Sequence, residues 1–168
     1  DFCKEKKIPC LGLSDTSNLC GALEFAENIS KVGTQPIIGT QIYFKFEDTT
    51  GLLPLIALNE NGYKRIIELS SRSYLENDAL SDPHLDIKEL LINVEGVSLL
   101  SGTIQGLFGK LFEKGRLDEI SKLYKSLSSK FNDKLLSHIA NHQKRILEYQ
   151  LTIQVRLEQI EKEPLQTQ

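Results

Sequence analysis

The sequence lacks several features that would place it at once in a particular class of protein. Its 168 residues include no Met and no Trp, and its three cysteines, Cys3, Cys10 and Cys20, form no Cys-x-x-Cys pair. An odd set of cysteines without a signal-peptide pattern predicts no disulfide framework, so we expect reduced thiols and a cytoplasmic location. No apolar run approaches the roughly 20 residues that cross a bilayer, and we therefore expect no membrane partner.

Charge of one sign is also scarce, since 20 Lys and Arg residues stand against 23 Asp and Glu residues, for a formal net charge of -3. A protein that works mainly by neutralising DNA phosphates needs a concentrated Lys/Arg surface. We therefore expect any contact with DNA to come through a larger parent protein. The length predicts one domain, and the start at Asp1 without any Met leads us to expect a piece of a longer chain.

Short apolar segments alternate with segments of helical periodicity along the sequence, which is typical of α/β proteins built from β/α units around a parallel sheet. The apolar segments show little polar alternation, so we expect strands that are buried on both faces. The expected strands are 10–14, 36–44, 53–58 and 96–100. The expected helices are 18–32, 63–74, 86–92, 106–113 and 117–131.

The second of these helices follows Asn59, whose side chain is expected to accept a hydrogen bond from the first helical turn. Ile66, Ile67 and Tyr74 share its apolar stripe in the sequence pattern. The segment 141–168 is polar, rich in Gln and Glu and only loosely periodic. The fold of that segment is therefore left open.

Asp15 is the most informative single residue, because it ends the first expected strand and precedes a helix directly. In parallel β/α proteins the carboxyl ends of the strands carry the functional sites, which favours a ligand or catalytic role. Asp, Ser and Asn at such a junction also cap the first helical turn and complement its dipole. Both roles remain open for Asp15, and capping is the more frequent one.

Other candidate motifs are weaker. His138 and His142 are four residues apart, a spacing that puts them on one face of either a helix or a strand. A zinc site needs three or four ligands, however, and no further ligand motif accompanies them. We therefore expect two solvent-facing histidines. The glycines from Gly102 to Gly109 match neither phosphate-binding motif and are interpreted as turn residues. No Gly-x-Ser-x-Gly motif is present.

Several segments stand out by their order and spacing: Cys10–Gly21, Ala22–Phe25, Gln35–Gly39, Leu58–Lys64, Leu69–Ser71, Tyr74–Leu75 and Glu95–Gly102. Together they resemble the polymerase-and-histidinol-phosphatase (PHP) domain at the amino end of the bacterial replicative DNA polymerase III alpha subunit. The resemblance is best over 8–133. It implies an α/β fold, a partial (β/α)7 TIM-like barrel that lacks its first and last strands, with 1–168 forming a single incomplete PHP domain.

Intact members of this family bind a trinuclear metal centre, with Zn or Mn, that activates water for phosphoester hydrolysis. The resemblance implies a degenerate centre here, because Thr16 replaces a histidine, Gln41 an acidic residue and Thr103 a cysteine. Asp15 and His142 are the matched positions that retain a metal-binding residue type. Two such residues do not hold a multinuclear cluster, so we expect no catalytic residue and no cofactor in this fragment, while the parent polymerase would use Mg.

The resemblance further implies a part of a DNA-directed DNA polymerase, a nucleotidyltransferase that acts in DNA replication. The domain would serve as a scaffold and as a dock for the proofreading exonuclease subunit, beside other replicase subunits. Two alternatives remain open from the sequence. One is a free-standing PHP-type metal-dependent phosphoesterase, and the other is an interaction module with neither metal nor polymerase attached.

Overall fold

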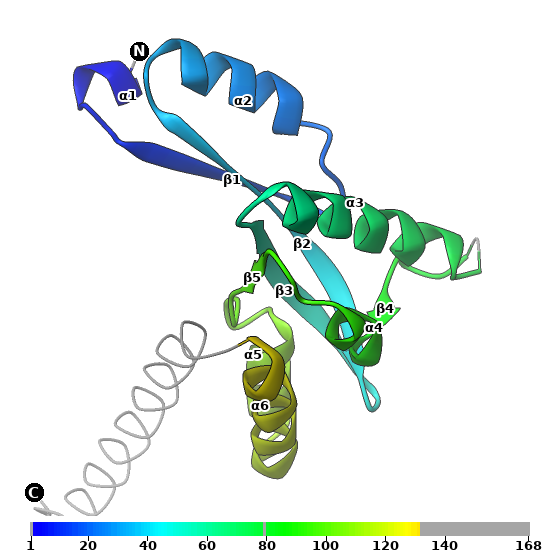
Figure 1. Cartoon of the computed structure of the whole chain (residues 1–168). Helices are drawn as coiled ribbons and strands as arrows, with labels where there is room; N and C mark the ends of the chain where they lie inside the picture. Colours follow the sequence, from blue (N-terminus) through cyan, green and yellow to red (C-terminus); the bar gives the residue numbers. More distant parts are fainter. Residues whose placement is uncertain (1, 79, 132–168) are drawn as a thin grey trace, which may run out of the picture.

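The computed structural model describes residues 2–78 and 80–131, which form a mixed α/β structure with a sheet of five strands and flanking helices (Figure 1). All four strands expected from the sequence are present, within a few residues, and so are the five expected helices. The elements are α1 Phe2–Glu5, β1 Cys10–Thr16, α2 Ala22–Lys31, β2 Gln35–Phe46, β3 Thr49–Ala57, α3 Glu60–Leu75, β4 Leu85–Asp86, α4 Ile87–Ile92, β5 Val97–Leu99, α5 Leu107–Glu113 and α6 Leu117–Phe131.

The sheet is not the parallel sheet that the sequence predicts, because β3 runs antiparallel to both of its neighbours. The strand order is β1-β2-β3-β5, with the short β4 beside β2; β1 and β4 pair with β2 in parallel. Phe46 and Thr49 are register partners, so only Glu47 and Asp48 connect β2 to β3. A turn of this length joins antiparallel strands, whereas a parallel pair needs a long crossover. In this turn Glu47 adopts a left-handed backbone conformation, with a positive φ of 53°.

The antiparallel strands β2 and β3 form a hairpin, and neither strand is buried on both faces. Along β3, buried residues alternate with half-buried ones, and Leu53 and Leu55 are fully buried. Ile42 and Phe44 of β2 are also fully buried and belong to the same core. The expectation of two-sided burial was wrong because the apolar residues between them, such as Leu52, are only half-buried on the opposite face.

Helix α3 packs on the buried face of the sheet through Ile66 and Leu69, which are both fully buried. Ile67, expected on the same stripe, is instead 41% exposed. The rotation of the helix is set by a close approach of Gly62 to the backbone of Gly96, where a Cβ on Gly62 would overlap the carbonyl oxygen of Gly96. The apolar stripe of the sequence is therefore broader than the face that the helix buries, and its outer part is in solvent.

Two polar interactions hold the amino-terminal half of α3. Asn59 caps the helix as predicted, because its Oδ1 accepts a hydrogen bond of 2.9 Å from the backbone N–H of Gly62. The buried guanidinium of Arg65 donates to the carbonyl oxygens of Glu89, at 2.6 Å, and Asn93, at 3.2 Å. Since both acceptors lie in or just after α4, Arg65 ties the two helices together.

The tip of the β2–β3 hairpin is held by Arg116, which lies just before α6. Its guanidinium donates hydrogen bonds to Asp48 in the turn, to Thr49 at 3.1 Å and to Glu119 at 2.6 Å. The hydrogen bond from Arg116 holds the pKa of Asp48 below its ordinary value. The same interaction raises the pKa of Arg116, so the guanidinium stays charged and attaches α6 to the sheet.

We expect Leu69→Ala to lower the free energy of unfolding by about 2–5 kcal/mol, because it leaves a cavity in a closely packed core. The matched control is Leu75→Ala at the end of the same helix, where the side chain is 82% exposed. That change is expected to stay within about 0.5 kcal/mol. Urea denaturation of both variants measures the difference, and equal losses would contradict the packing of α3 through Leu69.

We expect Arg116→Gln to raise the pKa of the Asp48 carboxyl toward its ordinary value of about 4. A depressed folded-state pKa adds stability that is present above the unfolded pKa and is lost as the pH falls through the folded pKa. In Arg116→Gln, the part of the free energy of unfolding that is lost as Asp48 becomes protonated is therefore absent at every pH. Carboxyl-carbon NMR titration checks the shift, with Lys122→Gln in α6 as the charge-matched control. An unchanged Asp48 titration in Arg116→Gln would contradict the interaction.

Candidate functional site

The sequence-predicted positions Thr16 and Gln41 are brought together, because they are register partners at the end of the paired part of β1 and β2. Gln41 is also the register partner of Pro54 in β3, whose carbonyl oxygen accepts a hydrogen bond of 2.9 Å from the N–H of Leu100. A row of residues therefore crosses the sheet from β1 to the end of β5. Thr103 follows in the loop after β5, with β3 between it and Gln41.

Asp15 does not join this row. Its Oδ2 accepts a hydrogen bond of 3.1 Å from the N–H of Gly21, the residue immediately before α2. Successive strand residues point to opposite faces of a sheet, so Asp15 is directed toward α2 while Thr16 and Gln41 share the other face. The hydrogen bond of Asp15 is to a loop N–H outside the first turn of α2, which has no side-chain cap, so its capping role and its role as a metal ligand both stay predictions.

The loop between β1 and α2 is held by buried hydroxyl groups that the sequence reasoning missed. Thr40, fully buried, has its Oγ1 2.8 Å from the carbonyl oxygen of Asp15 and 2.9 Å from that of Asn18. The hydroxyl of Ser70 in α3 donates to the carbonyl oxygen of Ser17 at 3.1 Å. Ser17 itself has a positive φ of 58°. Two signals in the sequence could have revealed these contacts: Thr40 lies inside an apolar strand, and Ser70 lies on the apolar face of a helix.

The row offers neutral hydroxyl and amide groups. Thr103 lies in a turn: its carbonyl oxygen accepts a hydrogen bond from the N–H of Gly106 at 2.9 Å, and its Oγ1 accepts one from the N–H of Gln105 at 3.3 Å. Within residues 2–78 and 80–131, no three His, Cys, Asp or Glu side chains gather closely enough to hold a metal ion. His142, like His138, lies outside the described residues. The row suits hydrogen bonding to a ligand better than metal coordination.

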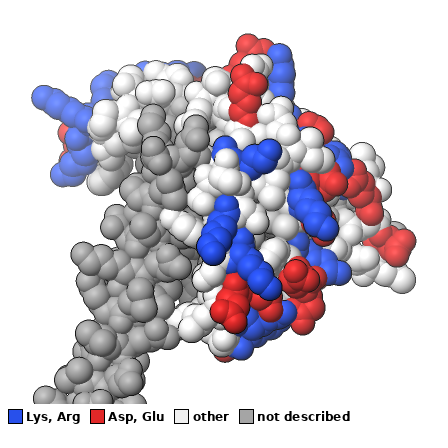
Figure 2. Space-filling view, turned by 60° about the horizontal axis from the view of Figure 1, so that its bottom comes forward, with Lys and Arg blue, Asp and Glu red and all other residues white. Residues whose placement is uncertain are grey.

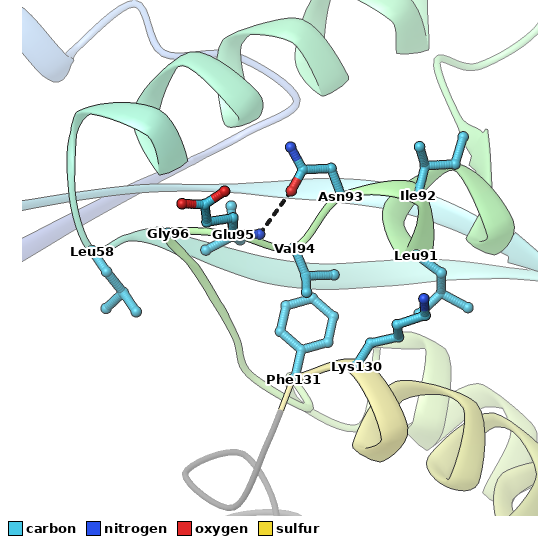
Figure 3. Close-up of a pocket in the computed structure, with 10 residues that line it drawn as sticks. Leu58, Leu91, Ile92, Asn93, Val94, Glu95, Gly96, Lys130 and Phe131 are labelled. Carbon is cyan, nitrogen blue, oxygen red and sulfur yellow. Dashed lines mark hydrogen bonds between the residues drawn. The ribbon is translucent and has the colours of Figure 1, made fainter.

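A hollow of about 490 Å³ lies at the other end of β5 (Figure 3). Its walls come from Leu58 after β3, from the α4–β5 connection and from the last turn of α6. Because β5 runs from the hollow toward the row, the two features are separate. The lining residues are Leu58, Leu91, Ile92, Asn93, Val94, Glu95, Gly96, Val97, Lys130 and Phe131.

On the face shown in Figure 2, Lys and Arg side chains are interspersed with Asp and Glu side chains, so the described residues form no large patch of a single charge there. Elsewhere among the described residues, cations are paired with carboxylates: Arg116 with Asp48 and Glu119, and Arg72 with Glu89 at 2.7 Å. This agrees with a solvated surface of mixed charge. Among the described helices, none has the length and apolar character of a membrane span.

The chain belongs to the PHP domain family, whose model matches residues 1–142. Its relatives include DNA polymerase III subunit alpha of Caulobacter vibrioides, 33% identical over 151 residues, which cover 82% of this chain and 13% of the relative. The same subunit of Rickettsia felis is 33% identical over 84% of this chain and 12% of the relative. That of Vibrio cholerae is 31% identical over 75% of this chain and 11% of the relative.

The predicted family is thereby confirmed. This chain spans only about 13% of the length of the Caulobacter relative that it matches. Among solved structures, a protein from Bifidobacterium adolescentis described as a metal-dependent phosphoesterase matches with a TM-score of 0.35 and 15% identity, over 44% of this chain and 26% of that chain. A likeness at this level carries no argument about function.

We expect Asp15→Ala to lower the free energy of unfolding by about 1 kcal/mol, because the N–H of Gly21 loses its acceptor. Asp15→Asn is the matched control, since its amide oxygen can still accept that hydrogen bond, and its loss is expected to be smaller. Urea denaturation of the two variants provides the comparison. A loss in Asp15→Asn as large as that in Asp15→Ala would show that the hydrogen bond to Gly21 is not what Asp15 contributes.

Proposed function

We propose that this chain is an amino-terminal part of a DNA polymerase III alpha subunit, a DNA-directed DNA polymerase of DNA replication. Its PHP domain acts as a scaffold and as a dock for the proofreading exonuclease subunit, within a replicase that contacts DNA through the parent polymerase. The similarity to polymerase subunits over 82% of the chain supports the parent assignment. We place the protein in the cytoplasm.

The observation that carries the proposal is the pairing of Thr16 with Gln41 at the strand ends. A metal centre that activates water needs carboxylate, imidazole or thiolate ligands, which neutralise the ions and fix their geometry. A hydroxyl and an amide side by side bind hard cations less well than a carboxylate does. The domain therefore has no hydrolase activity of its own, and Asp15 and His142 are remnants of the ligand set.

The finer description of the fold is part of this proposal: one incomplete domain over 1–168, a (β/α)7 barrel of the PHP type without its first and last strands. Supporting it, α2 and α3 lie toward one face of the sheet, while Thr16 and Gln41 lie on the other. In a barrel that other face is the interior, where strand ends carry the site. The antiparallel β3 is a departure from the regular alternation.

The proposal predicts direct binding of the intact parent protein to the proofreading exonuclease subunit of the same replicase, with a dissociation constant of about 1 μM or tighter, which corresponds to about -8 kcal/mol. Isothermal titration calorimetry measures it. Hydrolysis of a generic phosphoester with Mn²⁺ or Zn²⁺ is expected to stay at background. The double variant Thr16→His with Gln41→Glu is the control for metal detection, because it places an imidazole and a carboxylate at paired positions.

Two outcomes would count against this function. Absence of exonuclease binding removes the docking role while leaving the polymerase assignment in place. Metal-dependent hydrolysis by the wild-type protein, with bound metal found by elemental analysis, would instead favour the metal-dependent phosphoesterase.

A further inference from the structure

The hydrophobic core is distributed unevenly over the described residues. The buried members of the core cluster all lie between Ile42 and Leu127. Among the described residues before Thr40, Leu19 alone packs against this cluster, and it is half-buried. The segment Cys10–Lys31, which comprises β1, the loop after it and α2, extends away from the rest of the sheet together with the start of β2 (Figure 1). We call this segment the β1–α2 unit, and it lies largely outside the main core.

The β1–α2 unit buries little apolar surface of its own. None of the described residues of β1 is buried, and in α2 only Ala22 is. Leu11 of β1 is 37% exposed, and Leu23 of α2 is 73% exposed. The strands of a parallel pair are normally covered on both faces, and a helix as short as α2 is only marginally stable by itself. Apolar burial therefore contributes little to holding the unit in place.

Hydrogen bonds to its loop hold the unit against the rest of the molecule instead. The buried Oγ1 of Thr40 lies 2.8 Å from the carbonyl oxygen of Asp15, and the hydroxyl of Ser70 donates to that of Ser17 at 3.1 Å. The N–H of Ser17 donates to the carbonyl oxygen of Gln41 at 2.7 Å. A hydrogen bond adds less net stability than the full burial of a large apolar side chain, so this attachment is weaker than the packing of the core.

We propose that the β1–α2 unit opens as one cooperative segment while the β2–β3 hairpin and α3 stay folded. Segments with few buried apolar contacts open locally at a lower free energy than the core. Opening separates β1 from β2, so it parts Thr16 from Gln41 and frees the edge of β2 over Gln35–Gln41. An unpaired strand edge can pair with another strand. The unit therefore switches between a closed state with the row complete and an open state with an accessible sheet edge.

Amide hydrogen exchange of the full chain tests this proposal. We expect the hydrogen-bonded amides of β1 and α2 to have protection factors at least about 10-fold lower than those of β3 and α3. Leu123→Ala, at a fully buried core position in α6, is expected to lower the protection of β3 and α3 and to leave that of β1 and α2 unchanged, because the unit opens without the core. Equal protection in all four elements, or an equal loss in all four on Leu123→Ala, would overturn the proposal.

A matched pair of serines tests what holds the unit closed. Ser70 and Ser73 are both buried in α3, but only Ser70 donates to the loop, whereas the hydroxyl of Ser73 donates to the carbonyl oxygen of Ser70 at 2.7 Å. Ser70→Ala is expected to raise the exchange rates of the β1 and α2 amides about 5-fold, and Ser73→Ala to leave them unchanged. Circular dichroism checks that both variants are folded. Equal rates in the two variants would overturn the closure of the unit by the Ser70 hydroxyl.

Discussion

The packing of β2 against its neighbours is the constraint on which the rest of the structure depends. β1, β3 and β4 all pair with this 12-residue strand, and β5 joins the sheet through β3. Its residues Ile42 and Phe44 are completely buried, with Leu53 and Leu55 of β3 in the same core. Because one face of the hairpin forms the core, a shift of one residue in its register would turn these side chains to the opposite face. The positions of β1, α3 and α6 are therefore set relative to one rigid hairpin.

That register also decides what the site can do. It places Thr16 beside Gln41 and Gln41 beside Pro54, and it separates Asp15 from them by directing its carboxylate to α2. The neighbours in the row are thus uncharged, and a hydroxyl or an amide neither neutralises a cluster of cations nor exchanges a proton near neutral pH. The strand ends meet at one edge of the sheet, and the row that crosses them carries no carboxylate, imidazole or thiolate group. The proposed scaffold and docking role, which depends on the shape of the domain and not on bound metal ions, is consistent with this combination.

Most of the local structure was predictable because β-branched residues, helical periodicity and Asn59 as a cap each act within a few residues of the sequence. The direction of β3 was not, since the turn Glu47-Asp48 lacks the Asn-Gly or Asp-Gly pair that marks tight hairpins. The rotation of α3 depends on contact between Gly62 and Gly96, which are far apart in sequence. The same limit applies to the site: the spacing of residues located Asp15 at a strand end, but only the fold shows which face its carboxylate takes.

The contacts that hold the β1–α2 loop explain how the strand ends can keep their form without charged ligands in the row. The loop is fixed by the hydroxyls of Thr40 and Ser70 and by the carboxylate of Asp15, all of which bond to backbone groups. None of these three residues lies in the row of Thr16 and Gln41. Buried hydroxyls of this kind are costly to leave unpaired, so they stabilise one loop conformation by themselves. The conformation of the β1–α2 loop therefore does not depend on the side chains of Thr16 and Gln41.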